Sequence, residues 1–306
     1  MSALSAAAEN LLPGADEAPR CADHQRHLGV DPGGSAIDTD LLILVDIARP
    51  WPAKIADHPL LTDRAPEIEL AGGRARVVAT VPVDGARHRI RAYWRDGPAA
   101  TGVGFWFDRP TDLDAVFAEL GRVHPSEAAA DPSVPAPARL VLVCAHGSRD
   151  QCCGTDGTRL AAQLGQARPG LAVERTSHLG GHRFSPTALT LPDGRMWADL
   201  DLDTLLRIID RVGDAAAVTP KCRGWWGAAA GEAQMAERAA LTRHGWELDD
   251  HERDVVALAD DRYEVRWAGG PDRFRVTAAR EVPTIACRQP GGRPAKPGHE
   301  YSVADD

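Results

Sequence analysis

Short apolar runs and amphipathic stretches alternate along most of this 306-residue chain, a pattern that predicts a mixture of strands and helices. The run at 41–47, Leu-Leu-Ile-Leu-Val-Asp-Ile, predicts a buried strand because it is short, partly β-branched and closely followed by two prolines. Segments 74–82 and 89–94 predict further strands, and segment 112–122 predicts a helix because its apolar residues recur at helical spacing. The N-terminal part is therefore expected to be a mixed α/β unit.

After a proline-rich stretch, the alternation of strand and helix patterns becomes regular. The predicted segments are a strand at 139–144, a helix at 155–166, a strand at 172–176, a hairpin at 188–200 and a helix at 204–212. Strand, helix, strand, hairpin and helix in this order are the βαββα arrangement of a thioredoxin-like domain. The predicted fold class is therefore α/β, with a thioredoxin-like central domain.

A last helix at 232–244, followed by three short strands between 254 and 278, predicts a small C-terminal α+β unit. Stretches that are rich in breakers or lack a periodic apolar face give the predicted boundaries. The predicted division is a disordered N-terminus at 1–20, an N-terminal α/β domain at 21–130, a proline-rich linker at 131–138, the thioredoxin-like domain at 139–217, the C-terminal α+β unit at 218–288 and a flexible tail at 289–306.

Charge and composition exclude several functional classes. The chain has 35 basic and 44 acidic residues and a formal net charge of -9. It has no cluster of lysine and arginine with interleaved aromatic residues, so nucleic acid is not an expected partner. No apolar stretch reaches the roughly 18 residues that span a bilayer, and the first residues do not resemble a secretory signal. We therefore expect a cytoplasmic protein without a membrane partner.

Cysteine and histidine residues gather in two short segments. Cys144 ends a predicted strand, Cys152 and Cys153 precede a predicted helix, and His178 and His182 follow the next strand. A helix N-terminus stabilises a thiolate, and the strands of a βαβ unit bring their following loops to one edge of the sheet. We therefore predict a four-ligand metal site formed by Cys144, Cys153, His178 and His182.

Two thiolates and two imidazoles suit zinc or a 2Fe-2S cluster, and the residue types alone leave both open. A zinc-protease helix is excluded, because Leu179 stands where that motif requires glutamate and two glycines follow it. Six cysteines in a chain of this length are too few for a disulfide framework. The isolated cysteines, Cys21, Cys222 and Cys287, are expected to be small buried apolar side chains without chemistry.

The segment Cys-Ala-His-Gly-Ser-Arg-Asp-Gln-Cys-Cys-Gly at 144–154, followed by Ser-His-Leu-Gly-Gly-His-Arg-Phe at 177–184, resembles the sucrase/ferredoxin-like family. Fungal members of that family include thioredoxin-like 2Fe-2S ferredoxins. The resemblance implies a 2Fe-2S cluster and a carrier of single electrons between a donor and an acceptor redox protein, rather than an enzyme. By this resemblance the cluster ligands are Cys144, Cys153, His178 and His182.

Several alternatives stay open beside this prediction. Cys152 is adjacent to Cys153 and competes with it as a ligand, or the two could be the attacking and resolving thiols of a thiol-redox protein. The same four ligands could hold a structural zinc ion without a redox role. Glycoside hydrolysis, which the family name suggests, requires a suitably spaced pair of carboxylates, and no Asp or Glu pair stands out from the surface charge.

Overall fold

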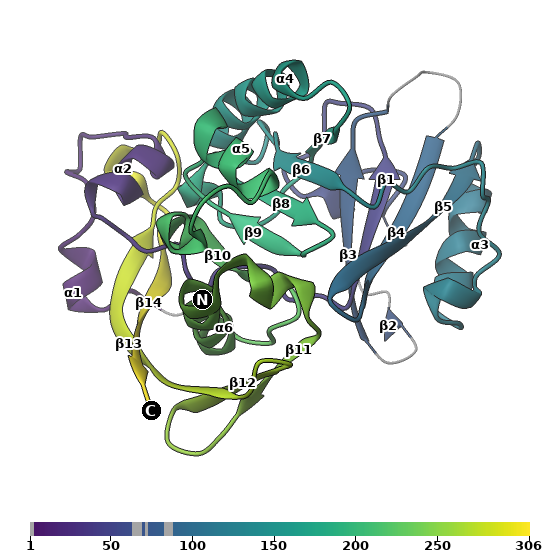
Figure 1. Ribbon diagram of the computed structural model, residues 1–306. Helices are drawn as coiled ribbons and strands as arrows, with labels where there is room; N and C mark the ends of the chain where they lie inside the picture. The colour runs from purple at the N-terminus through teal and green to yellow at the C-terminus, as the bar shows by residue number, and fades with distance from the viewer. Residues whose placement is uncertain (1–2, 63–68, 71–72, 83–87) are drawn as a thin grey trace.

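The computed structural model describes residues 3–62, 69–70, 73–82 and 88–306, and it contains one large mixed sheet and a second, antiparallel sheet (Figure 1). This arrangement confirms the α/β class. In spatial order, the strands of the large sheet are β10 (Cys222–Trp225), β9 (Arg195–Trp197), β8 (Ala188–Leu191), β6 (Leu140–Cys144), β7 (Ala172–Thr176), β3 (Gly73–Thr80), β1 (Leu41–Asp46), β4 (His88–Asp96) and β5 (Ala99–Phe107), with β2 (Glu69–Leu70) paired to β3.

The large sheet consists of two halves with the same strand pattern. One half contains β1, β3, β4 and β5, and the other contains β6, β7, β8 and β9. In each half the first strand pairs in parallel with the second and antiparallel with the third. The third strand then pairs antiparallel with the fourth. The halves join where Thr80 of β3 pairs antiparallel with Thr176 of β7. Asp46 pairs with Thr80 and Cys144 with Thr176, so Asp46 and Cys144 occupy equivalent positions.

Strand β6 is buried on both faces, which explains its unbroken apolar sequence. Val141 and Val143 face α4 and α5, whereas Leu142 and Cys144 face a second apolar cluster that extends to β1. Cys144 is therefore held at the carboxyl end of a rigid central strand. The helices are α1 (Ala6–Glu9), α2 (Cys21–His27), α3 (Pro110–Leu120), α4 (Thr158–Ala167), α5 (Leu202–Ile209) and α6 (Gly231–His244).

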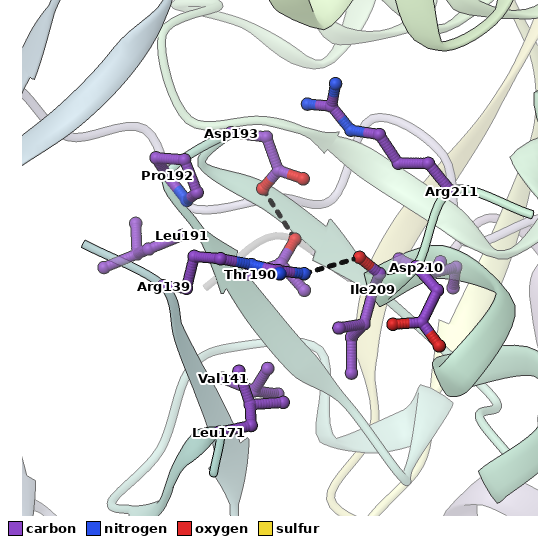
Figure 2. A pocket seen from close by; sticks show the side chains of 11 residues that line it. Arg139, Val141, Leu171, Thr190, Leu191, Pro192, Asp193, Ile209, Asp210 and Arg211 are labelled. Atoms are coloured by element: carbon purple, nitrogen blue, oxygen red, sulfur yellow. Dashed lines mark hydrogen bonds between the residues drawn. The ribbon is translucent and has the colours of Figure 1, made fainter. Parts of the chain in front are cut away.

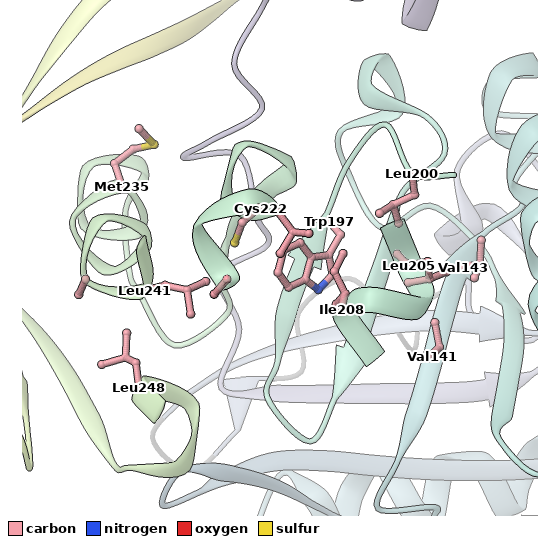
Figure 3. Close-up of a cluster of buried hydrophobic side chains, with 14 of the residues drawn as sticks. Val141, Val143, Trp197, Leu200, Leu205, Ile208, Cys222, Met235, Leu241 and Leu248 are labelled. Carbon is pink, nitrogen blue, oxygen red and sulfur yellow. The ribbon is translucent and has the colours of Figure 1, made fainter. Parts of the chain in front are cut away.

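The second sheet curves around α6 in Figure 1, and its strands β11, β12, β13 and β14 pair in that order. Their bounds are Arg253–Ala257, Arg262–Trp267, Asp272–Thr284 and Lys296–Asp305. A continuous apolar cluster joins α6 to β6, β9 and α5 (Figure 3). Cys222 lies in this cluster, as expected of an isolated apolar cysteine. The labelled side chains in Figure 3 are Val141, Val143, Trp197, Leu200, Leu205, Ile208, Cys222, Met235, Leu241 and Leu248.

The N-terminal segment expected to be disordered is partly helical. Ser5 caps α1 by accepting a hydrogen bond from the Ala8 backbone N–H at 3.3 Å, and its own N–H donates to Glu281 of β13 at 2.8 Å. Ala8 is fully buried. A helix of four residues has too little periodicity to be recognised from sequence, and it is stabilised here by packing against a distant strand.

The C-terminal segment expected to be a flexible tail forms strand β14. It pairs with β13 from Phe274 opposite Asp305 to Thr284 opposite Lys296. The breakers Pro297 and Gly298 lie inside this strand, which is an edge strand, where a missing backbone donor is tolerated. The composition of this segment predicted a loop. A local composition gives no information about the unpaired edge of a distant strand, here β13, with which the segment pairs.

The predicted linker at 131–138 packs against the sheet. The N–H of Asp131 donates to the Gly104 carbonyl of β5 at 2.8 Å, and Val134 is buried. The units predicted on either side of this linker share the large sheet, and their division into domains stays a prediction. Within the described residues, no helix has the length and apolar character needed to cross a membrane.

Candidate metal centre

A tight turn after β6 brings Cys153 back beside Cys144. Cys153 begins a short π-helix, η3 (Cys153–Gly157), and a π-helix is a rare element that is frequent at functional sites. A Cβ atom on Gly157 would lie 1.8 Å from the Cys144 carbonyl oxygen, and one on Gly154 would lie 2.5 Å from the Gly147 Cα. These close approaches require glycine at positions 154 and 157, so the two glycines allow the two cysteines to meet.

Cys144 and Cys153 form a fully buried, interacting pair. The hydrogen bond from Cys153 lowers the pKa of Cys144, and the imidazole of His178 lowers it further. The same hydrogen bond, together with burial, raises the pKa of Cys153. The shared proton therefore favours ionisation of Cys144 over ionisation of Cys153, and a bound cation would displace a thiol proton from the pair.

The loop after β7 turns back on itself through two glycines in the left-handed region. Gly180 has a φ of 76° and Gly181 a φ of 60°, conformations that side chains with a Cβ rarely adopt. The turn places the imidazoles of His178 and His182 next to each other, with ring centroids 5.8 Å apart. Both side chains are half-buried, so they form the part of the site nearest to solvent.

His178 is held through its backbone and has an unsatisfied ring nitrogen. Its N–H donates to Nδ1 of His146 at 3.1 Å, and Nε2 of His146 donates to the Pro52 carbonyl at 2.8 Å. Burial lowers the pKa of His146, which stays neutral in this double role. Nδ1 of His178 is buried and has no hydrogen-bond partner among the described residues. Such an atom is costly unless a ligand binds it.

His182 is oriented by a buried carboxylate. Its Nδ1 donates to Oδ2 of Asp150 at 2.9 Å, and Oδ1 of Asp150 accepts the Cys152 backbone N–H at 2.8 Å. With the proton on Nδ1, the lone pair of Nε2 is available to a metal. A carboxylate that accepts the second ring N–H of a histidine is the usual companion of histidine ligands. The roles of Asp150 and His146 were not predicted from the sequence, although both residues lie in the motif that carried the resemblance.

A buried guanidinium balances the charge of this site. Arg223 of β10 is fully buried and donates to the Gly180 carbonyl at 3.3 Å and to Ser35. Burial lowers the pKa of Arg223 to about 10, and the nearby thiols of Cys144 and Cys153 act in the opposite direction. A positive charge beside two buried thiolates favours their ionised form.

The predicted ligands therefore gather in one place, with Cys144 in contact with Cys153 and His178, and His182 beside His178. Their role as ligands stays a prediction. Cys152 points elsewhere: its side chain belongs to a separate cluster with Cys21 and Ile285. The side chains of the two adjacent cysteines therefore pack in different apolar clusters.

A second group of metal-ligand side chains surrounds Cys152. One ligand atom from each of Cys21, Asp150, Cys152 and Cys287 lies within 4.8 Å of the other three, an arrangement that could hold a metal ion. Hydrogen bonds from Cys152 and Cys21 lower the pKa of Cys287 to about 3. Cys21 is buried in an apolar cluster, as predicted, and Cys287 packs against it half-buried, but their proximity to Cys152 and Asp150 was not predicted. They lie more than a hundred residues from Cys152 in the sequence, so no spacing rule connects them.

Two cavities flank the central strands at opposite ends. A cavity of about 390 Å³ is lined by Lys54, Arg76, Arg149 and His178, so the candidate site borders a basic pocket. A cavity of about 460 Å³ at the other end of β6 is lined by Arg139, Thr190 and Asp193 among others, and none of its lining residues is Cys or His (Figure 2).

The profile of the Sucrase/ferredoxin-like family matches residues 74–224. Residues 74–224 belong to the sucrase/ferredoxin-like family. No curated protein and no solved structure matches the chain. The sucrase/ferredoxin-like region runs from β3 to β10 and includes the four predicted ligands, whereas Cys21 and Cys287 lie outside it.

Proposed function

We propose that this protein carries single electrons on a 2Fe-2S cluster held by Cys144, Cys153, His178 and His182. The observation that carries the proposal is the buried Nδ1 atom of His178, which has no hydrogen-bond partner among the described residues, on a side chain that interacts with Cys144 of the Cys144 and Cys153 pair. Membership of residues 74–224 in the sucrase/ferredoxin-like family supports it.

The residues present fit such a group. Two thiolates and two imidazoles are the ligand set of Rieske-type clusters. The cysteines lie in the apolar interior and the histidines toward solvent, so an electron can enter through the histidine side. A bound 2Fe-2S cluster supplies a centre that takes up and returns one electron. Because neutral imidazoles replace two anionic thiolates, we expect a potential above the roughly -400 mV of plant-type ferredoxins.

The surrounding residues position the ligands and balance their charge. Asp150 keeps a proton on Nδ1 of His182, and His146 holds the backbone of His178. Arg223 adds a buried positive charge beside the thiolates. This charge stabilises the additional negative charge that the site gains when it is reduced. These contacts orient both histidines and balance the negative charge of the two cysteines.

The order of the strands and helices around this site supports its assignment to a thioredoxin-like domain. The chain order β6, α4, β7, β8, β9 and α5 is the βαββα order, and β6 lies between β7 and β8 in the sheet. The first half of the sheet has the same strand pattern, but it has Asp46 where the second half has Cys144. We therefore assign electron transfer to the second half alone.

The basic pocket beside His178 suggests where redox partners dock. Lys54 and Arg149 are exposed there, and Arg76 donates to the His178 carbonyl at 3.2 Å. In a chain of net charge -9, this local positive charge favours donor and acceptor proteins that present an acidic surface. Nucleic acid and membranes are not proposed partners.

Metal analysis of anaerobically purified full-length protein tests the proposal. We expect two irons and two acid-labile sulfides per chain, lost in Cys153→Ser and in His178→Ala. Cys222→Ser is the matched control, because Cys222 is equally buried but lies in the apolar cluster of Figure 3. Zinc in place of iron at these four residues would instead make the site structural.

A further inference from the structure

Three cysteines from distant parts of the chain meet next to the candidate cluster site. Cys21 begins α2, Cys152 precedes η3, and Cys287 follows β13. Sγ of Cys152 lies 3.8 Å from Sγ of Cys21 and 3.5 Å from Sγ of Cys287. Oδ2 of Asp150 lies 3.1 Å from Sγ of Cys21. Cys21 and Cys152 are fully buried, whereas Cys287 is half-buried and gives access from solvent.

We propose that Cys21, Cys152, Cys287 and Asp150 bind a Zn²⁺ ion at a second site, separate from the four ligands of the cluster. Four ligands are the number that a structural zinc site requires. Three thiolates select a soft or borderline metal, and the carboxylate oxygen favours Zn²⁺ over Cu(I). The site would link α2, η3 and the segment after β13.

The sulfur spacings match a tetrahedral zinc site. With zinc–sulfur bonds of about 2.3 Å, neighbouring sulfurs of a tetrahedron lie about 3.8 Å apart. The two measured spacings are 3.8 and 3.5 Å. A disulfide would require an Sγ–Sγ distance of about 2.05 Å, and all three cysteines are free thiols.

The charges around the second site suit an anionic ligand set. Three thiolates and a carboxylate exceed the charge of one Zn²⁺ ion, so nearby cations are needed to stabilise them. Arg20 lies beside Cys152 and pairs with Asp156, whereas the buried Arg183 lies beside Cys21.

The adjacent residues Cys152 and Cys153 contribute to different sites. The side chain of Cys153 packs with Cys144, and that of Cys152 packs with Cys21. Asp150 touches both sites, since the oxygen that contacts Cys21 also accepts a hydrogen bond from Nδ1–H of His182. A metal at the second site would therefore hold Asp150, and through it His182, in place.

Element analysis of full-length variants tests this proposal apart from the proposed function, because zinc reports on one site and iron on the other. We expect one zinc per chain in the wild type. The zinc content should fall at least about tenfold in Cys21→Ser and in Cys287→Ser, whereas the iron content should not change. Cys144→Ser should lose iron and keep zinc. Cys222→Ser is the matched buried control and should keep both metals.

X-ray absorption at the zinc edge of the wild type gives an answer that does not depend on the folding of any variant. The proposal predicts three sulfur neighbours at about 2.3 Å and one oxygen at about 2.0 Å. It is overturned if purified protein supplied with Zn²⁺ binds none, if Cys21→Ser and Cys287→Ser retain the zinc, or if intact-mass analysis finds any two of the three cysteines joined in a disulfide.

Discussion

Nδ1 of His182 lies 2.9 Å from Oδ2 of Asp150, and this contact joins the two groups of candidate metal ligands. Asp150 leaves only Nε2 of His182 with a free lone pair, and it lies within 3.1 Å of Cys21 in the second group. The buried carboxylate therefore determines how His182 faces the proposed cluster.

Replacing Asp150 should weaken the proposed cluster site without removing a ligand of that site. In Asp150→Asn the ring of His182 loses its charged acceptor, and loss of such an outer partner typically costs 10- to 100-fold in affinity, so we expect roughly that effect here. The measurement is the loss of iron to a chelator, followed by visible absorption. Asp16→Asn, at an exposed carboxylate, should behave as the wild type. Equal stability of the Asp150→Asn and wild-type sites would show that the contact has no positioning role.

Gly157 offers a test of the local geometry. In Gly157→Ala the new Cβ would lie 1.8 Å from the Cys144 carbonyl oxygen, so β6 and η3 must separate. We expect a loss of at least about 1 to 3 kcal/mol in unfolding free energy, measured by urea titration, and a reduced metal content.

A second glycine, in the helix that follows η3, is the matched control for Gly157. Gly165 is within α4, and a Cβ there would have nothing within 4 Å. Gly165→Ala should therefore stabilise the protein by up to about 1 kcal/mol, because alanine has the higher helix propensity. Similar effects of the two substitutions would show that the contact between η3 and Cys144 is not tight.

The basic pocket should control the rate at which charged reagents exchange electrons with the protein. In Arg149→Glu we expect anionic ferricyanide to oxidise the reduced protein several-fold more slowly at low salt, and a cationic cobalt complex to react faster. Both effects should fade near 1 M salt, where the screening length is about 3 Å. Arg262→Glu, on β12, is the control. Equal rates for Arg149→Glu and wild type with both reagents would place the electron route elsewhere.

Asp193 should make stability depend on pH. Burial and the neighbouring Asp249 raise the pKa of Asp193 from 3.8 to about 6. Because the folded-state pKa is the higher one, folding favours the protonated carboxyl. This contribution is fully present below about pH 4 and is lost as the pH rises through 6. Asp193 lines the cavity in Figure 2, where it accepts a hydrogen bond from Thr190 at 2.6 Å.

The comparison that isolates this residue is with Asp193→Asn, which cannot ionise. Relative to the wild type, the variant should gain unfolding free energy between pH 4 and pH 7, measured by urea titration at each pH. Asp16→Asn, which replaces an exposed carboxylate, is the control. A constant difference between Asp193→Asn and wild type across this range would show that Asp193 titrates normally.

Local patterns predicted the elements that position the proposed cluster site. Strands β1, β6, β7 and β8 and helix α3 lie within about two residues of their predicted bounds, because each buries a face that its own periodicity reveals. Helix α4 begins at Thr158 rather than 155, since η3 occupies the preceding residues. The spacing of the four predicted ligands indicated that they lie close together, because they follow two adjacent strands of one βαβ unit. These ligands are Cys144, Cys153, His178 and His182.

What the sequence did not predict depends on contacts between distant segments. The helix α1 and the strand β14 both rely on β13. The second cysteine group combines the start of α2 with residues after β13, segments that no local pattern links. The role of Asp150 became visible only when the loop containing His182 was placed against it.

The central claim is that two histidines and two cysteines hold the 2Fe-2S cluster. The most direct test is pulsed EPR of the dithionite-reduced protein, prepared with ¹⁵N-labelled histidine, in wild type, His178→Ala and His182→Ala. The account predicts an S = 1/2 signal with hyperfine coupling to two histidine nitrogens in the wild type, and the loss of one coupling or of the whole signal in each variant. A wild-type signal without histidine coupling, or one unchanged by both substitutions, would contradict it.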